Sequence, residues 1–305
     1  MKHLGAIDAI EDAEGVSVVG GRDLDKIKAF AKEHNISHYT TDLAESLARD
    51  DVDCVILATP TQMHAAQVTQ CMKAGKHVQT EIPMADNLED AQAIVALQQE
   101  TGLVAMAGHT RRFNPSHQWI HSKVQAGELK VLQMDVQTYF FRRTNTNAKG
   151  EARSWTDHLL WHHACHTVDL FQYQTGETAS QVQAMQGPIH PDLGIALDMS
   201  IGMKVPNGAL CTLSLSFNND GPFGTFFRYI CDKGTYIARY DDLEDGKGNP
   251  IDLSDVAVSF NGIELQDREF FAAIREGREP NSSLSKCYSA METLDRLEQC
   301  LNMVE

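Results

Sequence analysis

The chain has 305 residues, of which 42% are hydrophobic and 22% charged, and its formal net charge at pH 7 is −16. This length suffices for two domains that each have a core. The negative charge argues against nucleic-acid binding, which needs a basic surface, and weakly against an anionic membrane surface. No apolar run reaches the roughly 18 residues of a membrane span. The seven cysteines form no C-x-x-C pair, which is typical of reduced thiols, so we expect a cytoplasmic protein.

The first third of the chain alternates short apolar runs with stretches of helical periodicity. Such a rhythm predicts β-α-β units, a parallel sheet and right-handed crossovers. Glycines at positions 75 and 102 stand where helix C-caps are expected. We therefore predict a doubly wound α/β domain over residues 1–112. Its expected strands cover 16–20, 54–59, 77–80 and 103–107, and its expected helices cover 25–34, 43–49, 63–74 and 88–101.

The pattern changes after Arg112, where one more helix opens at Asn114-Pro115 and strands then dominate. Pro206-Asn207-Gly208 and Asp232-Lys233-Gly234 supply turn residues for two antiparallel hairpins. We predict an α+β domain over residues 113–305, built on an open, largely antiparallel sheet. Its expected strands cover 132–142, 197–204, 209–217, 226–231 and 235–240, and its closing helices cover 264–276 and 284–303.

Three short segments of the first domain carry a family resemblance. The sequence TPTQMH occupies 59–64, GKHV occupies 75–78, and Glu81-Ile82-Pro83 follows. In this order they resemble the glucose–fructose oxidoreductase/inositol dehydrogenase family, whose first domain is a Rossmann-type dinucleotide-binding fold. The resemblance runs through the whole chain and implies a dehydrogenase that uses a nicotinamide cofactor. The residues that it assigns to cofactor binding are Thr59, Pro60, Thr61, His64, Glu81 and Pro83.

The chain departs from the family at its start. It contains no G-x-G-x-x-G, the loop that brings a helix N-terminus to the cofactor's pyrophosphate. Lys2-His3-Leu4 corresponds to the helix that follows this loop in the family, so the first strand is apparently missing. We expect an N-terminal truncation or a misassigned start codon. The alternative is a chain that has lost cofactor binding.

A second departure concerns the family's Glu-Lys-Pro motif, in which Ile82 replaces the lysine. Sugar dehydrogenases of the family use that lysine to lower the pKa of the hydroxyl group that they oxidise. An isoleucine cannot do this, so the replacement disfavours sugar oxidation.

The turn after the first predicted strand bears on the choice of cofactor. Small residues followed by an arginine, here Gly21 and Arg22, accommodate a 2′-phosphate, whereas an acidic residue would favour NAD. We therefore predict NADP. Asp23 keeps NAD possible, and Arg22 as a merely exposed loop residue is the alternative reading.

A histidine-rich segment follows at positions 158–166. In a regular helix His158, His162 and His166 would share one face. They could be metal ligands, although no H-E-x-x-H and no carboxylate ligand accompany them, or packed core histidines. The family pattern D-x-x-x-H-x-x-D instead matches His166 to the catalytic histidine and Asp169 to the last aspartate, with His162 in place of the first. We predict that His166 and His162 are catalytic and that there is no metal.

Five arginines lie at the expected junction of the two domains or on the strand that faces it, and their guanidinium groups can pair with carboxylates bidentately. The alternative is a solvated basic strip. The segments GHTRRFNP and WTDHLLWHHACHTVDL look similar to a family member that oxidises the cyclic hemiacetal of a carboxylated semialdehyde to a lactone with NADP, in aromatic-acid degradation. The predicted substrate ligands are Arg111, Arg112, Arg142, Arg153 and His163, with Arg143 beside them.

Three further expectations follow from the resemblance. The open sheet of the second domain commonly forms the family's dimer contact, so we expect a homodimer. A sugar or dihydrodiol dehydrogenase is one alternative function. A regulator that senses a ligand or dinucleotide without catalysis is another, and the replaced lysine is consistent with it.

Overall fold

The computed structural model describes residues 2–21, 23–146, 150, 152, 157–256 and 262–303. Contacts divide the chain into two compact units. The first unit contains Met1–Ala85, Glu89–Gly108 and Ile263–Lys286, and the second contains Asp86–Leu88, His109–Gly262 and Cys287–Glu305. The chain therefore returns to the first unit after it has built the sheet of the second.

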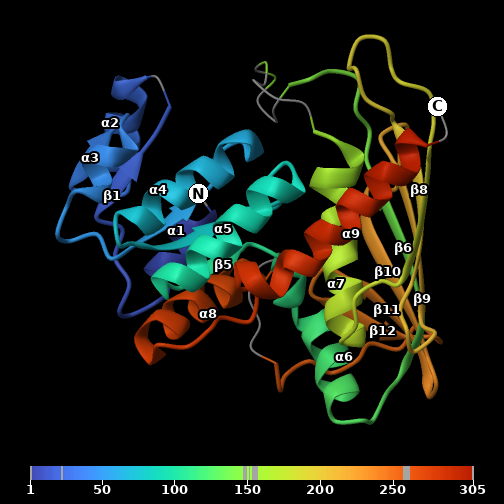
Figure 1. Cartoon of the computed structure of the whole chain (residues 1–305). Helices are drawn as coiled ribbons and strands as arrows, with labels where there is room; N and C mark the ends of the chain where they lie inside the picture. Colours follow the sequence, from blue (N-terminus) through green and yellow to red (C-terminus); the bar gives the residue numbers. More distant parts are fainter. Residues whose placement is uncertain are drawn as a thin grey trace. The chain divides into compact units, whose positions relative to one another are not determined.

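The first unit is an α/β arrangement of short parallel strands and helices (Figure 1). Its strands are β1 (Ser17–Val19), β2 (His38–Thr40), β3 (Cys54–Leu57), β4 (His77–Thr80) and β5 (Ala105–Ala107). Its helices are α1 (Lys2–Asp8), α2 (Leu24–Glu33), α3 (Leu43–Leu47), the 3₁₀ turn η1 (Thr61–Met63), α4 (His64–Lys73), α5 (Leu88–Thr101) and α8 (Ile263–Glu276). The predicted doubly wound character is confirmed.

The parallel strands of the first unit form two separate sheets. One pairs β1 with β2, and the other has the order β3-β4-β5. Within the described residues β1 pairs with no strand except β2, and β3 with none except β4. In a doubly wound sheet the first strand lies between these two halves. The polar strand β2 was not predicted, since HYT lacks an apolar run.

Local chemistry explains where the helices of this unit end and how closely they pack. Gly75 and Gly102 adopt positive φ angles of 75° and 66° after α4 and α5, which confirms the predicted C-caps. A Cβ atom on Gly20 would lie 2.4 Å from Cγ1 of Ile27, so α2 packs against the end of β1 only because that position is glycine.

The second unit is built on one continuous seven-stranded sheet, which confirms the predicted open, largely antiparallel sheet. Its order is β12-β11-β10-β6-β9-β8-β7, and all neighbours are antiparallel except β6 and β9. The strands are β6 (Val131–Tyr139), β7 (Gln181–Gln186), β8 (Asp198–Lys204), β9 (Leu210–Ser216), β10 (Gly224–Cys231), β11 (Gly234–Arg239) and β12 (Asp242–Asp245). Both predicted hairpins are present, whereas β7 and β12 were not predicted because polar residues dominate them.

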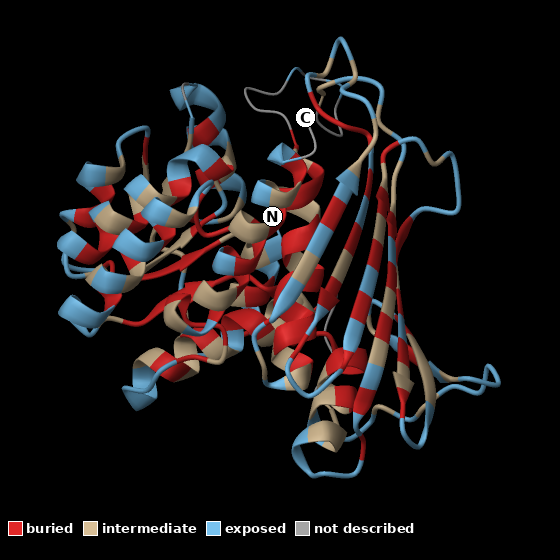
Figure 2. Cartoon of the chain, turned by 45° about the vertical axis from the view of Figure 1, so that its right-hand side comes forward, coloured by how far each residue is buried: buried red, intermediate tan, exposed pale blue. Residues whose placement is uncertain are grey.

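Helices cover one face of this sheet and leave the other face open (Figures 1 and 2). Met199, Ile201 and Met203 of β8 are buried, while the residues between them face outwards. The remaining elements are η2 (Thr110–Arg112), α6 (Pro115–Gln125), η3 (Leu159–Ala164), α7 (Cys165–Thr175) and α9 (Leu284–Asn302). No helix among the described residues is long and apolar enough to cross a membrane.

Candidate functional site

The ring of His64 connects the loops that follow β3 and β4 through hydrogen bonds to their backbone. The ring nitrogens Nδ1 and Nε2 of His64 lie 2.8 Å from the carbonyl oxygens of Pro83 and Thr59, respectively. His64 is only 1% exposed, so it holds the two loops rather than presenting its ring at the surface. The hydroxyl of Thr59 donates to Gln67 at 2.6 Å. The structure thus brings the TPTQMH and Glu-Ile-Pro segments together at the carboxyl ends of parallel strands, where doubly wound folds bind ligands.

A partly buried polar cluster surrounds Glu81. Nε2 of His3 lies 2.9 Å from Oε1 of Glu81, and Nδ1 lies 2.9 Å from Oδ2 of Asp267 on α8. Asp267 also accepts a hydrogen bond from Gln79 at 2.8 Å. Burial alone would lower the pKa of His3, but the hydrogen bonds to Asp267 and Glu81 outweigh it and raise the pKa to about 9. This cluster links α1, the end of β4 and α8.

Of this cluster, only Glu81 was predicted from the sequence to belong to a site. His3 and Asp267 are 264 positions apart, and neither belongs to a spacing pattern that predicts their contact. Only the position of Glu81 in its motif directs attention to this part of the chain.

The turn between β1 and α2 is where the adenosine ribose of the predicted cofactor is expected to bind. A Cβ atom on Gly21 would have no atom within 4 Å, so this side of the turn is open. Asp23 caps α2 by accepting a hydrogen bond from the backbone N–H of Lys26 at 3.1 Å. Arg22 lies outside the described residues.

The histidine-rich segment of the second unit is not a regular α-helix. Leu159–Ala164 forms a π-helix that continues into α7. Because a π-helix bonds residue i to i+5, the α-helical spacing used to place His158, His162 and His166 on one face does not hold here. Short π segments occur frequently at functional sites.

A backbone hydrogen bond from His158 orients the ring of His162. The N–H of His158 donates to Nδ1 of His162 at 2.7 Å, and Nε2 of His162 lies 4.0 Å from Asp86. Burial lowers the pKa of His162 to about 4, against the attraction of Asp157. The neighbouring His163 packs edge-on against Phe217, with ring centroids 5.0 Å apart.

His166 was predicted to be the catalytic base. Its Nδ1 atom is buried and has no hydrogen-bond partner among the residues that the structure describes. Burial lowers its pKa well below the usual value, and the positive charge of Arg111 adds to that effect. The ring is therefore neutral near pH 7, which is the protonation state that a general base needs before it reacts.

The guanidinium of Arg111 lies within cation–π distance of two aromatic rings. Its guanidinium carbon is 4.8 Å from the ring centre of Tyr240 and 5.8 Å from that of Phe227. One terminal nitrogen donates to the Asn114 side-chain oxygen at 3.3 Å. A guanidinium that is stacked on its faces keeps its N–H groups in the plane of the fork, where a carboxylate would bind.

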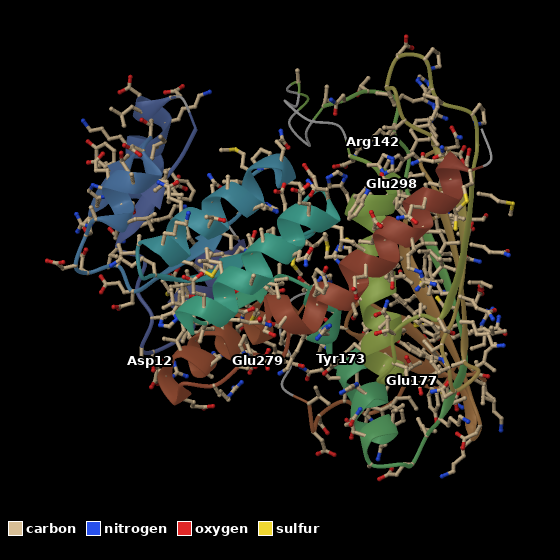
Figure 3. The ribbon with its side chains drawn as sticks, viewed as in Figure 1. Asp12, Arg142, Tyr173, Glu177, Glu279 and Glu298 are labelled. Atoms are coloured by element: carbon tan, nitrogen blue, oxygen red, sulfur yellow. The ribbon has the colours of Figure 1, made fainter. Side chains whose placement is uncertain are left out.

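Arg112, unlike Arg111, is paired with a carboxylate of the protein. Its Nε and terminal nitrogen donate to the two oxygens of Asp169 at 2.8 and 2.6 Å, and these residues are 4% and 1% exposed. Its guanidinium also lies 4.6 Å above the ring of Tyr173, which Figure 3 labels on α7. The fork that was predicted to bind a substrate carboxylate already binds a carboxylate of the protein.

Asp169 is also the centre of the group of possible metal ligands that the described residues contain. His109, Asp169 and Cys287 are all buried, and their ligand atoms lie within 4.8 Å of one another. The guanidinium of Arg112 already neutralises the carboxylate, and a cation beside it would be repelled. We therefore assign this group to the packing of η2 and α9 against α7.

The remaining predicted substrate ligands lie near the start of the π-helix or outside the described residues. Arg142, labelled in Figure 3, donates to Asp157 and stacks 4.7 Å from the ring of Phe217. Arg143 donates to the Phe217 carbonyl oxygen at 3.2 Å. Arg153 lies outside the described residues.

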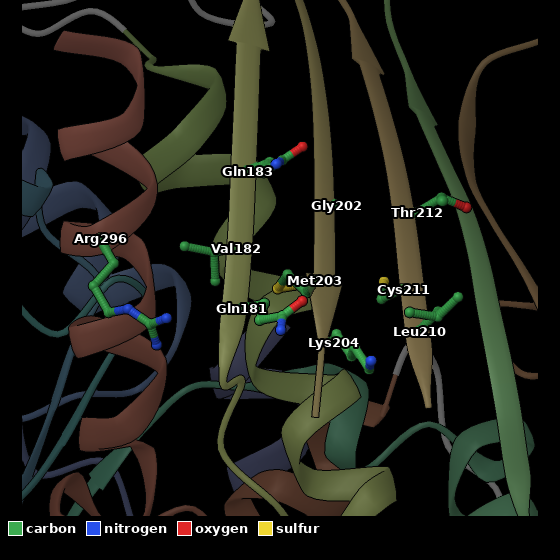
Figure 4. Close-up of a pocket in the computed structure, with 10 residues that line it drawn as sticks. All are labelled: Gln181, Val182, Gln183, Gly202, Met203, Lys204, Leu210, Cys211, Thr212 and Arg296. Carbon is green, nitrogen blue, oxygen red and sulfur yellow. The ribbon is translucent and has the colours of Figure 1, made fainter. Parts of the chain in front are cut away.

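A pocket of about 600 Å³ lies elsewhere, on the sheet of the second unit (Figure 4). Gly202 at its centre has no side chain and is flanked by Gln183 and Thr212 on the neighbouring strands. None of the residues that line this pocket was predicted to bind cofactor or substrate.

Comparisons with known proteins agree with this architecture. Residues 1–109 match a family described as an oxidoreductase family with an NAD-binding Rossmann fold, and residues 115–257 match the C-terminal domain of bacterial oxidoreductases. The chain is 65% identical to 4-carboxy-2-hydroxymuconate-6-semialdehyde dehydrogenase from Sphingobium sp. (strain NBRC 103272 / SYK-6) over 97% of its own length and 94% of that protein. It is 24% identical to inositol 2-dehydrogenase 2 from Paenarthrobacter aurescens, over 88% and 82% of the two chains.

Solved structures show the same fold at lower identity. An oxidoreductase from Agrobacterium radiobacter, in complex with NAD⁺, L-tartaric acid and magnesium, superposes with a TM-score of 0.85 at 17% identity. The match covers 99% of this chain and 93% of that one. Levoglucosan dehydrogenase in complex with NADH and levoglucosan gives 0.84 at 17% identity, with the same coverage. The chain therefore belongs to the glucose–fructose oxidoreductase/inositol dehydrogenase family of NAD(P)-dependent oxidoreductases.

Proposed function

We propose that the protein oxidises the cyclic hemiacetal of 4-carboxy-2-hydroxymuconate-6-semialdehyde to the lactone 2-pyrone-4,6-dicarboxylate, with NADP as the hydride acceptor. The observation that carries this proposal is the 65% identity, over 97% of the chain, to a dehydrogenase of that name. The substrate is a small polycarboxylate, and the described residues of the second unit place a neutral histidine near an aromatic-stacked arginine.

The residues of the first unit fit a nicotinamide dinucleotide in part. Thr59, Pro60, Thr61, Glu81 and Pro83 lie on the loops at the carboxyl ends of β3 and β4. When bound, the nicotinamide ring supplies the acceptor for the hydride. The sequence has no glycine-rich phosphate loop, so we assign no residue to the pyrophosphate.

The preference for NADP is supported by the open turn at Gly21 and by the position of Asp23. A carboxylate that favours NAD must reach the ribose 2′-hydroxyl. Asp23 instead accepts a hydrogen bond from the backbone of α2, which holds it at the helix N-terminus. A 2′-phosphate would meet the open side of Gly21, and Arg22 remains its predicted partner.

The chain's own residues would divide the reaction between proton transfer and orientation. The neutral ring of His166 accepts the proton of the hemiacetal hydroxyl while the carbon-bound hydrogen leaves as hydride, and the C–O bond becomes the carbonyl of the lactone. His162 would support His166, and Arg111 would hold a carboxylate of the substrate. Arg142, Arg153 and His163 stay as predicted ligands of the other carboxylate.

The test is a direct assay with the ring-cleavage product of protocatechuate. Absorbance of reduced nicotinamide is followed with NADP and with NAD, and the product is identified chromatographically. We expect turnover that is faster with NADP and yields the lactone. Absence of turnover with both cofactors, for a protein that still binds a dinucleotide, would reject the enzymatic proposal in favour of a sensor.

We also propose a homodimer that uses the open face of the seven-stranded sheet. Met185 and Leu210 point outwards from this face and are 70% and 43% exposed. Light scattering should then give twice the chain mass of 33.8 kDa, and Met185→Asp should shift it towards one chain mass. The seven cysteines are all free, which is consistent with the proposed cytoplasmic location.

A further inference from the structure

The turn between β11 and β12 breaks a local rule of chain conformation. Tyr240 and Asp241 alone connect the paired residues Arg239 and Asp242. Tyr240 has a φ angle of 53°, a region that glycine or asparagine usually occupies in two-residue hairpins. A bulky residue at positive φ is uncommon and costs conformational energy, so the surrounding structure must hold it there.

Two side chains at the start of α6 hold this turn. The hydroxyl of Ser116 donates to the carbonyl oxygen of Tyr240, and the amide of Asn114 donates to Asp241 at 2.7 Å. Ser116 and Asn114 are both fully buried. These hydrogen bonds are costly to lose, because the buried donors of Ser116 and Asn114 would be left without a partner. The turn is therefore fixed to the same segment that carries Arg111.

With this backbone conformation, the ring of Tyr240 lies against the guanidinium of Arg111. The guanidinium carbon of Arg111 lies 4.8 Å from the ring centre, within the range of a cation–π interaction. Gly224, at a φ angle of 114°, leaves room for the phenol, since a Cβ there would lie 3.1 Å from the Tyr240 hydroxyl. The ring of Tyr240 is therefore held next to Arg111 by three features. These are its own backbone conformation, the space left by Gly224, and the hydrogen bonds from the start of α6.

We propose that Tyr240 is a positioning residue that fixes the guanidinium plane of Arg111 for a substrate carboxylate, and that its unfavourable backbone conformation is kept for this purpose. The inference rests on the proposed function, because it takes Arg111 as the carboxylate ligand. Stacking restricts rotation of the guanidinium about its long side chain, while the N–H groups at its edge stay directed in the plane. Less entropy is then lost when the carboxylate binds.

The test replaces Tyr240 with glycine and with phenylalanine in the full chain. Glycine adopts the φ angle of 53° without strain, so Tyr240→Gly should keep or raise the melting temperature. Loss of the ring should raise KM for the semialdehyde roughly tenfold and change kcat less. Tyr240→Phe keeps the ring and loses only the hydroxyl, which also forms a hydrogen bond with Arg111, so its KM should rise less than that of Tyr240→Gly. Asn35→Gly is the matched control, since Asn35 has a φ angle of 56° in the first unit and should leave KM unchanged.

A double-mutant cycle with Arg111→Ala identifies the partner of Tyr240. The KM effect of Tyr240→Gly should vanish in the Arg111→Ala background. A lower melting temperature with an unchanged KM, or a KM effect that persists without Arg111, would show that Tyr240 only supports the turn.

The unsubstituted protein is assayed first, so that failure of the proposed function is seen separately. If it turns over no semialdehyde, the same variants are titrated with pyridine-2,6-dicarboxylate by calorimetry. Weaker binding that depends on both Tyr240 and Arg111 would still support the positioning role. Equal binding by all variants, or none by the unsubstituted protein, would overturn it.

Discussion

Two partly buried histidines, one in each unit, have pKa values that move in opposite directions. His3 lies between Glu81 and Asp267, and its pKa is raised to about 9. His166 lies near Arg111 and His109, and its pKa is lowered well below 6.5. Burial lowers both values, so the charge of the neighbours decides the outcome. The histidine that links α1, β4 and α8 is surrounded by carboxylates, and the predicted catalytic histidine lies near positive charge and stays neutral.

The largest expected effect concerns the neutral histidine. Replacement of His166 by alanine should reduce turnover by about 10²–10⁴, the usual contribution of a general base. The melting temperature should change little, because Nδ1 of His166 has no partner to lose. Steady-state kinetics and thermal unfolding of the same preparation check this pair of outcomes. Near-full turnover would remove His166 from the proposed mechanism.

The second prediction separates Arg112 from its neighbour Arg111. Arg112→Ala leaves the carboxylate of Asp169 buried without its bidentate partner, which should cost about 3–5 kcal/mol of unfolding free energy. Arg111→Ala should instead raise KM and leave stability nearly unchanged. Denaturant unfolding distinguishes the two. If Arg112→Ala were as stable as the original chain and only KM rose, the predicted role of Arg112 as a substrate ligand would be favoured.

The third prediction uses the raised pKa of His3. Its folded value of about 9 exceeds the ordinary 6.5, so the stabilisation is complete below pH 6.5 and disappears as the pH rises through 9. Over that window the unsubstituted chain should lose on the order of 3 kcal/mol more than the His3→Gln variant. Unfolding free energies measured at pH 6 and pH 9.5 give the difference directly. If the unfolding free energies of the two proteins changed equally with pH, the proposed stabilisation by charged His3 would be contradicted.

The smallest expected effect concerns Cys165, the first residue of α7, which is 1% exposed. Cys165 precedes His166, the predicted catalytic histidine, so its thiol suggests a thiohemiacetal route, but the proposed hemiacetal oxidation needs no nucleophile from the protein. Cys165→Ala should therefore stay within about twofold of the original turnover, because the thiol makes no bond to the substrate. Mass spectrometry that found a covalent acyl-enzyme would refute this.

Long periodic elements could be predicted from the sequence, and short or irregular ones could not. The helix Leu88–Thr101 was predicted at its observed bounds, because caps and apolar spacing agree there. The strand β2 has three residues and no apolar run. The segment Leu159–Ala164 was predicted as α-helix but is a π-helix. In so short a segment, the spacing of apolar residues does not distinguish the two kinds of helix.

The candidate site was predictable only where residues are neighbours in sequence. Family motifs indicated His64 and Pro83, and the structure shows that the ring of His64 contacts the Pro83 carbonyl. The pairing of Arg112 with Asp169, and that of His3 with Asp267, depends on tertiary folding across 57 and 264 positions. Sequence alone assigned the same role to Arg111 and Arg112, since it contains no sign of which one is already paired.

The division of the parallel strands into two sheets has a consequence for local stability. The β1–β2 pair, with α2 and α3, shares no backbone ladder with the β3-β4-β5 sheet among the described residues. A cooperative unit of this kind can open without unfolding its neighbours. Amide protons of Val18 and Val19 should therefore exchange with solvent deuterium faster than those of Val78 and Gln79, and ligands that contact both sheets should slow that exchange.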